Sequence, residues 1–185
     1  MKYFFFAILA VIVIAVVYCI STHNTLVELQ NRISEAFSTM DVYLVKRSDL
    51  IPNLVATVKG YAKHETESLE KVVNARARAL GASSNADKLA AENELTGAIS
   101  RLFALAESYP DLKANTNFLS LQADLKEMEG DIASARRYYN GVVRKYNTML
   151  QTIPSRFIAS AMGLQREPMF EVADEKQREN VKVEF

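Results

Sequence analysis

The sequence has little of what most catalytic and metal sites require. Among 185 residues there are one cysteine, Cys19, and two histidines, His23 and His64. A single thiol cannot form an internal disulfide, and four tetrahedral zinc ligands are not present in any recognisable spacing. Glycine and proline are also scarce, with six and four residues. Because both weaken or break helices, their scarcity favours long helices.

An excess of charge of one sign is also missing, since 22 Lys and Arg balance 22 Asp and Glu. This balance argues against nucleic-acid binding, which uses basic residues to neutralise phosphates. His64-Glu65 begins a zinc-protease motif, but Ser68 stands where the second histidine is required, and no Glu-x-x-His pair suits a di-iron site. No glycine-rich phosphate loop or nucleophile elbow appears. We therefore expect no catalytic activity, no metal and no cofactor.

The most prominent feature present is an apolar run from Tyr3 to Ile20 without a charge, glycine or proline. As a helix it spans about 27 Å, close to the hydrocarbon thickness of a bilayer. The sequence therefore predicts an uncleaved transmembrane anchor over residues 1–22. A cleaved signal peptide with Lys2 as its charged region is the alternative, but the run exceeds the usual apolar length of about 7–15 residues.

Charges beside the anchor set its expected orientation. Lys2 and the α-amino group precede the apolar run, whereas Glu28 comes before Arg32, the first strong cation after it. The positive-inside rule then favours a cytoplasmic N-terminus and a bundle on the extracytoplasmic side, by a difference of a charge or two.

From Asn24 onward, apolar residues recur at intervals of three and four, most regularly from Phe118 to Ile153. A helix of that length cannot bury its apolar face alone and must pack on others. We expect an all-α fold, in which the N-terminal transmembrane helix precedes an antiparallel bundle of about four long helices. The expected boundaries are the anchor at 1–22, the bundle at 23–163 and a charged C-terminal tail at 164–185, with helices at about 23–47, 49–80, 86–108, 116–152 and 155–162.

The first break in the bundle is expected at Lys46–Asp49. Ser48 or Asp49 has the side chain of a helix N-cap, and Pro52 is tolerated in a first turn, where the amide has no intrahelical partner. A continuous helix kinked at Pro52 is the alternative.

One loop between long helices is a candidate interaction site, with Tyr109, Asp111, Lys113 and Asn115 as its polar and aromatic residues. A structural interpretation is favoured for the same residues. Pro110 ends a helix, Asp111 supports the turn, Asn115 caps the next helix and Tyr109 packs on the end of the bundle.

Three blocks of sequence resemble the signature segments of the LemA family of bacterial membrane proteins. They are DLIPNLVATVKGYAKHE at 49–65, YPDLKANTNFLSLQ at 109–122, and RRYYN at 136–140 followed by Tyr146-Asn147. The likeness extends from the apolar N-terminus to the closing KVEF, and Phe37 stands where the family usually carries tryptophan. The resemblance implies a single-pass protein of the bacterial cell membrane with a helical bundle, and it supplies no catalytic residues. Descriptions of the family place the short N-terminus outside, opposite to the charge argument.

These observations predict a non-catalytic scaffold or adaptor, anchored in the membrane of the bacterial envelope. Its expected partners are the lipid bilayer and an unidentified protein, or a second copy of the chain in a homo-oligomer. Genes of the family often neighbour those of membrane-bound stress proteases, so a regulator of such a protease is the alternative. An uncharacterised enzyme with its site in the helix-connecting loops is the second alternative.

Overall fold

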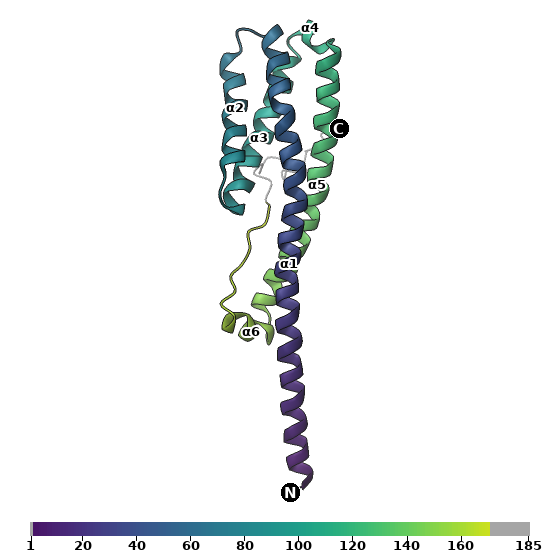
Figure 1. Cartoon of the computed structure of the whole chain (residues 1–185), viewed down its shortest axis with the longest axis vertical. Coiled ribbons are helices and arrows are strands. Elements are labelled where there is room, and N and C mark those ends of the chain that lie inside the picture. Colours follow the sequence, from purple (N-terminus) through teal and green to yellow (C-terminus); the bar gives the residue numbers. More distant parts are fainter. Residues whose placement is uncertain (1, 171–185) are drawn as a thin grey trace, which may run out of the picture. The chain divides into compact units, whose positions relative to one another are not determined.

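The computed structural model describes residues 2–170, and Figure 1 shows their arrangement. All regular elements in this range are helices, which confirms the expected all-α fold. Residues 171–185, most of the expected tail, lie outside the described part of the chain. The helices are α1 (Lys2–Tyr61), α2 (Thr66–Gly81), α3 (Asn85–Ala106), α4 (Pro110–Lys113), α5 (Thr116–Gln151) and α6 (Ser155–Ala161).

The chain forms two compact units, to which α1 and α5 both contribute. Unit 1 comprises residues 1–39 and 137–169, and therefore contains the apolar segment, the second half of α5 and α6. Among the described residues, unit 2 comprises 40–136 and Phe170, and contains the rest of α1, then α2, α3, α4 and the first half of α5.

The expected helix break near Ser48 is wrong, because α1 continues through Pro52 to Tyr61. A proline has no amide hydrogen, so the carbonyl four residues earlier, that of Ser48, loses its intrahelical donor. Arg76 of α2 replaces this donor: its Nε donates a hydrogen bond of 2.8 Å to the Ser48 carbonyl oxygen. The continuous helix is therefore the alternative interpretation of the sequence, and a side chain from a neighbouring helix, which the sequence pattern did not indicate, stabilises it.

The expected single helix over residues 49–80 is also wrong, since α1 ends at Tyr61 and α2 begins at Thr66. No proline marks this turn. The connection is held from elsewhere: Tyr109 donates a hydrogen bond of 3.0 Å to the Glu65 carboxylate, and Asn115 donates one of 2.9 Å to the Tyr61 hydroxyl. The chain reverses here because α2 buries its own apolar face against the other helices of unit 2.

The interior of unit 2 is one apolar cluster from four helices and the short α4. Leucine and alanine dominate it, and Phe118 packs edge-to-face on Phe103 with ring centroids 6.0 Å apart. Its buried members are Ile51, Leu54, Val58, Ala62, Leu69, Val72, Ala75, Ala79, Leu95, Ala98, Ile99, Leu102, Ala106, Leu112, Phe118 and Leu125.

The interior of unit 1 lies between α1 and the second half of α5. Phe37 packs edge-to-face on Tyr139 with ring centroids 5.8 Å apart, and Gln30 bonds to Tyr146. The earlier residue of α1 contacts the later residue of α5, so the two helices run antiparallel within this unit. The apolar residues buried here are Leu26, Leu29, Ile33, Ala36, Tyr139, Val143, Tyr146 and Ala159.

Candidate functional site

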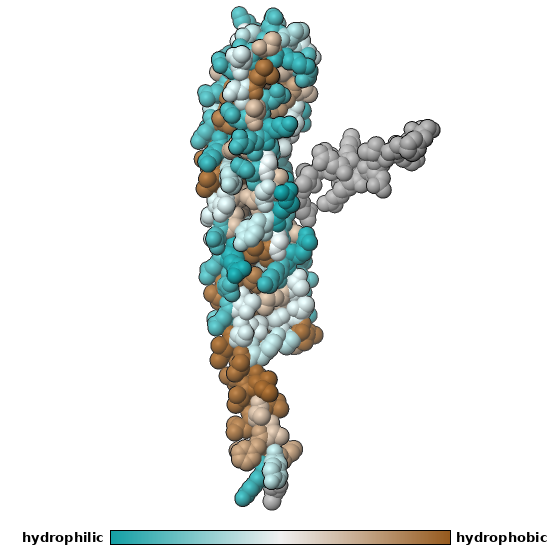
Figure 2. Space-filling model, turned by 90° about the vertical axis from the view of Figure 1, so that its right-hand side faces the viewer, coloured by the Kyte–Doolittle hydropathy of each residue, from teal (hydrophilic) through white to brown (hydrophobic). Residues whose placement is uncertain are grey.

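Within residues 2–170, no other part of the protein covers the apolar segment of α1. Every described residue from Lys2 to Ser21 is exposed, and Thr22 is the first buried residue of the helix. Figure 2 shows this segment as a largely hydrophobic surface. Among the described helices, α1 is the one long and apolar enough to cross a membrane. Large side chains such as Phe4, Ile14 and Ile20 would be costly to expose to water, so this surface suits hydrocarbon.

The predicted interaction loop lies at the end of unit 2 that also holds the turn between α1 and α2. Tyr109 is half-buried, and its bond to Glu65 raises the pKa of its hydroxyl, because ionisation would remove the proton that this hydrogen bond donates. Asn115 bonds in two directions. Its amide donates to Tyr61, and its side-chain oxygen accepts a bond of 2.9 Å from the Phe118 amide. It therefore caps α5, as predicted.

The two charged residues of the same loop are exposed. Asp111 lies in the first turn of α4, where a carboxylate interacts favourably with the helix dipole. Lys113 pairs with Glu107, and both of these side chains are more than half exposed. The four predicted residues therefore fall into two groups. Tyr109 and Asn115 bond to residues at the turn between α1 and α2, whereas Asp111 and Lys113 face solvent.

A cluster of charge that sequence reasoning missed lies inside unit 2. The side chain of Arg47 on α1 is 1% exposed, and it pairs with Glu92 of α3 and Glu129 of α5. Arg47 also donates a hydrogen bond of 2.7 Å to the Thr96 hydroxyl. One guanidinium group therefore connects three helices.

Burial dominates the electrostatics of this cluster. The pKa of Glu92 is raised because its carboxyl is withdrawn from water, and the attraction of Arg47 offsets only part of that cost. Asp41 adds to the rise by repulsion, although Lys88 pairs with Asp41 at the partly exposed edge. Glu92 is engaged in contacts between helices, whereas Glu129 and Asp41 remain partly exposed at the edge of the cluster.

A sequence signal for this cluster did exist. Arg47 occupies a position on the apolar face of α1, in the series Met40, Leu44, Arg47, Ile51, Leu54 and Val58. Glu92 likewise follows Leu89 and precedes Leu95 on the buried face of α3. An arginine and a glutamate at core positions of different helices predict a buried ion pair, since a lone buried charge is prohibitively costly.

Unit 1 holds the segment after α6 by buried side chains of α5. Asn147 donates a hydrogen bond of 2.9 Å to the Glu167 carbonyl and accepts one of 3.0 Å from the Glu167 amide. Tyr139 donates a bond of 2.9 Å to the Pro168 carbonyl, and burial raises the pKa of its hydroxyl to about 12. Both side chains satisfy backbone groups of a segment that has no helical hydrogen bonds of its own.

The fold and its exposed apolar helix define a class: membrane-associated all-α proteins, here with one candidate membrane-spanning helix in the part of the chain that the structure describes. Within that class, the family model described as "LemA family" matches residues 36–185 of the chain. The chain belongs to the LemA family.

Relatives cover most of the chain. It is similar to Protein LemA of Metamycoplasma hominis, with 25% identity over 92% of this chain and 80% of the relative. It is also similar to Magnetosome protein MamQ 2 of Paramagnetospirillum magneticum, with 23% identity over 89% of this chain and 72% of the relative. The same figures apply to Magnetosome protein MamQ 1 of that organism.

Proposed function

We propose that this protein is a membrane-anchored scaffold or adaptor without catalytic activity. The observation that carries the proposal is the continuity of α1, whose exposed apolar segment and buried bundle segment form one helix without a linker. A tether of this kind fixes a helical bundle to a bilayer, whereas a flexible linker would leave the bundle free to diffuse around its anchor.

The contacts of unit 2 support a role in binding rather than in chemistry. Its buried charges, Arg47 and Glu92, are consumed in holding helices together. Its predicted interaction loop combines a rigid base with two exposed charges of opposite sign, Asp111 and Lys113. Exposed charges on a loop held by hydrogen bonds are suited to selecting a partner of complementary charge.

A site-specific crosslinking experiment on native membranes tests the proposal. A photo-crosslinking amino acid at Asp111 of the full chain should form a discrete adduct, either with a partner protein or with a second copy. The same group at Lys71, an exposed position of α2 that pairs with Glu67, is the matched control. The adduct from position 111 should disappear when Lys113 is also changed to Ala. A chain that stays monomeric and gives no adduct from position 111 would contradict the proposal.

Regulation of a membrane-bound stress protease is the alternative form of this role, and it would make the partner at the loop a protease. Deleting the protein should then change the rate at which that protease degrades its substrates. Unchanged degradation rates in the deletion strain would exclude this alternative while leaving a scaffold role intact.

The proposed location is the bacterial cell membrane, with the bundle on the extracytoplasmic side as the charges beside the anchor predict. A reporter fused to the C-terminus tests the side. An exported reporter that is active, together with a cytoplasmic reporter that is silent, would agree with the prediction. The reverse pattern would place the bundle in the cytoplasm.

A further inference from the structure

The end of unit 1 that adjoins the apolar segment carries two large, exposed apolar side chains. Ile153, after the end of α5, is 74% exposed, and Phe157 of α6 is 68% exposed. The buried face of α6 consists of Ser155 and Ala159, which leaves Arg156 and Phe157 on its outer side. Exposed side chains of this size, gathered in one place, mark a contact surface more often than chance exposure.

The register of α1 and α5 places these residues beside the apolar segment. In the contacts Gln30–Tyr146 and Phe37–Tyr139, the two residue numbers add up to 176, so Gln151 is level with about residue 25 of α1. By the same register, Ile153 lies within about one helical turn of Ile20, where the apolar run ends. Burial along α1 begins at Thr22, at the same level. Figure 1 shows α6 beside this part of α1.

The side of unit 1 formed by α5, α6 and the segment that follows is strongly basic, although the whole chain is neutral. Residues 137–169 contain one carboxylate, that of Glu167, and five cations, which gives a net charge of +4: the cations are Arg137, Arg144, Lys145, Arg156 and Arg166. The first 39 residues add no net charge, since two cations balance two carboxylates. The excess of positive charge is therefore confined to the side of unit 1 formed by α5, α6 and the segment that follows.

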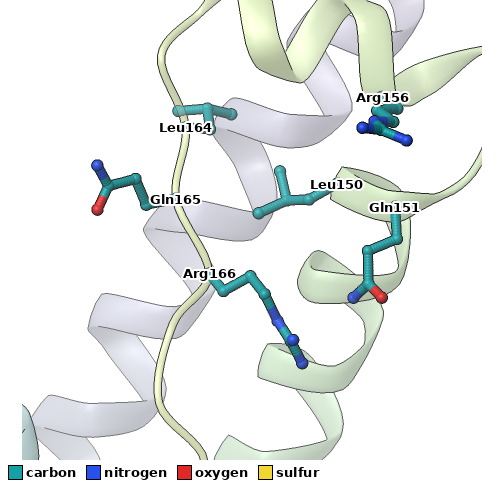
Figure 3. A pocket seen from close by; sticks show the side chains of 6 residues that line it. All are labelled: Leu150, Gln151, Arg156, Leu164, Gln165 and Arg166. Atoms are coloured by element: carbon teal, nitrogen blue, oxygen red, sulfur yellow. The ribbon is translucent and has the colours of Figure 1, made fainter.

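Two of these cations border a shared cavity. Arg156 and Arg166 line an open cavity of about 830 Å³ together with Leu150, Gln151, Leu164 and Gln165. Figure 3 shows Arg166 extending from the segment after α6 toward α5, whereas Gln165 points away. Neither guanidinium forms an ion pair with a carboxylate within residues 2–170, so both are available to an external anion.

We propose that this end of unit 1 is a second membrane contact, in which Ile153 and Phe157 enter the bilayer interface while Arg156 and Arg166 bind phosphate groups of anionic lipids. The proposal rests on the membrane anchoring proposed above. A lipid surface is the occupant because the patch is continuous with the helix that crosses the bilayer. Apolar side chains beside cations are also the combination that interfacial lipid binding uses.

Single-tryptophan reporters test this contact, since the natural sequence contains no tryptophan. The full chain with Phe157→Trp is reconstituted in vesicles of phosphatidylglycerol and phosphatidylethanolamine, some with brominated acyl chains that quench nearby tryptophan. We expect blue-shifted emission that brominated lipid quenches. The matched control is Tyr138→Trp, an exposed aromatic position of α5 in the same unit, which should emit as in water and resist quenching.

A third reporter separates failure of this inference from failure of the anchor. Tyr3→Trp reports on the apolar segment itself. If Tyr3→Trp is quenched but Phe157→Trp behaves like the Tyr138 control, the second contact is disproved and the anchor stands. If Tyr3→Trp is not quenched and the chain does not float with vesicles, the anchoring proposal fails as well. Blue-shifted emission of Phe157→Trp that brominated lipid does not quench, together with a crosslinked dimer, would assign the patch to self-association instead.

The role of the arginines is tested in the Phe157→Trp background. Replacing Arg156 or Arg166 with Gln should shift the equilibrium between docked and undocked states about five-fold toward the water-like emission for each arginine removed. The shift should occur in vesicles with phosphatidylglycerol and be absent with phosphatidylcholine alone. The matched control Arg32→Gln, whose side chain pairs with Glu28, should leave the emission unchanged. An equal effect of all three substitutions would contradict lipid phosphate binding.

Discussion

The two units of this protein solve the same problem, the burial of polar groups in a helical interior, by different means. Unit 2 buries full charges, with Arg47 paired to Glu92 and Glu129. Unit 1 buries neutral groups instead: Tyr139, Asn147 and Ser155 each bond to backbone carbonyls. Their overall charges also differ, since unit 1 carries +4, whereas residues 40–136 hold twelve cations and fourteen carboxylates.

The difference shows what each kind of interior costs. The cost of desolvating two buried charges cancels most of their mutual attraction. A buried ion pair is therefore strongly stabilising only in comparison with a variant in which one charge is left buried without its partner. A buried amide or hydroxyl costs less to desolvate and is satisfied by one or two hydrogen bonds. We therefore expect unit 2 to be much more sensitive than unit 1 to the loss of a single buried polar side chain.

The largest expected effect is that of Arg47→Ala. It leaves Glu92 buried without its cation and should lower the free energy of unfolding by about 3–5 kcal/mol. Hydrogen exchange on the full chain in nanodiscs should locate the loss of protection in unit 2. Arg32→Ala, at an exposed pair on the same helix, should cost less than about 0.5 kcal/mol. The double variant R47M/E92M should recover most of the stability, and if it does not, the contrast between the two units is wrong.

Arg76→Met tests the continuity of α1 and should cost about 2 kcal/mol, because it leaves the Ser48 carbonyl without a donor beside Pro52. Arg78→Met, two residues along the same helix, removes only an exposed pair with Glu94 and should cost less than about 1 kcal/mol. Thermal unfolding followed by circular dichroism compares the two. Equal losses would show that Arg76 does not support the helix at the proline.

Asn147→Ala is the corresponding test in unit 1 and should cost about 1–2 kcal/mol, since two hydrogen bonds to Glu167 are lost. Amide exchange at Glu167 should accelerate while unit 2 keeps its protection. Asn31→Ala, at an exposed position of α1, is the matched control and should leave exchange unchanged. Loss of protection in unit 2 would mean that the two interiors are not independent.

Tyr139→Phe has the smallest expected effect at neutral pH, about 0.5–1 kcal/mol for one hydrogen bond to Pro168. The effect that distinguishes this variant is a change of stability at alkaline pH. The folded-state pKa of about 12 lies above the ordinary value of 10.0, so the contribution of the hydroxyl is complete below pH 10 and is lost as pH rises through about 12. The stability advantage of the natural protein over the variant should therefore shrink across that range. Tyr138→Phe, at the exposed neighbouring residue, should show no such trend.

Local signals predicted the elements that depend on local chemistry. The spacing of apolar residues predicted an all-α fold, and Asn115 caps α5 because its side chain reaches an amide three residues later. The errors occur where distant residues decide. Pro52 lies within α1 because Arg76 supplies a donor, and the turn after Tyr61 is held by Tyr109 and Asn115. Neither partner lies within the window that a helix pattern samples.

The interaction site was predicted only as a stretch of sequence. Turn chemistry at Pro110 and Asn115 located the loop, but it could not indicate that Tyr109 reaches Glu65, which is 44 residues away. Arg47 and Glu92 were overlooked because a polarity pattern treats any charged residue as exposed. Both residues occupy positions on apolar faces, and this can be seen in the sequence. Predicting the ion pair requires only that a charged residue be accepted at a core position.

The antiparallel return of α5 changes how cations near the bilayer should be counted. Along the chain, Arg156 and Arg166 are more than a hundred residues from the anchor, so a rule based on neighbouring sequence ignores them. In the folded molecule α5 and α6 bring these two arginines back to the end of unit 1 that adjoins the anchor. If the proposed membrane contact of Arg156 and Arg166 holds, the charges beside the anchor favour an extracytoplasmic bundle during insertion, whereas the cations of the folded bundle favour the more anionic cytoplasmic leaflet. An orientation set during insertion would then have to persist although the folded bundle interacts more favourably with the other leaflet.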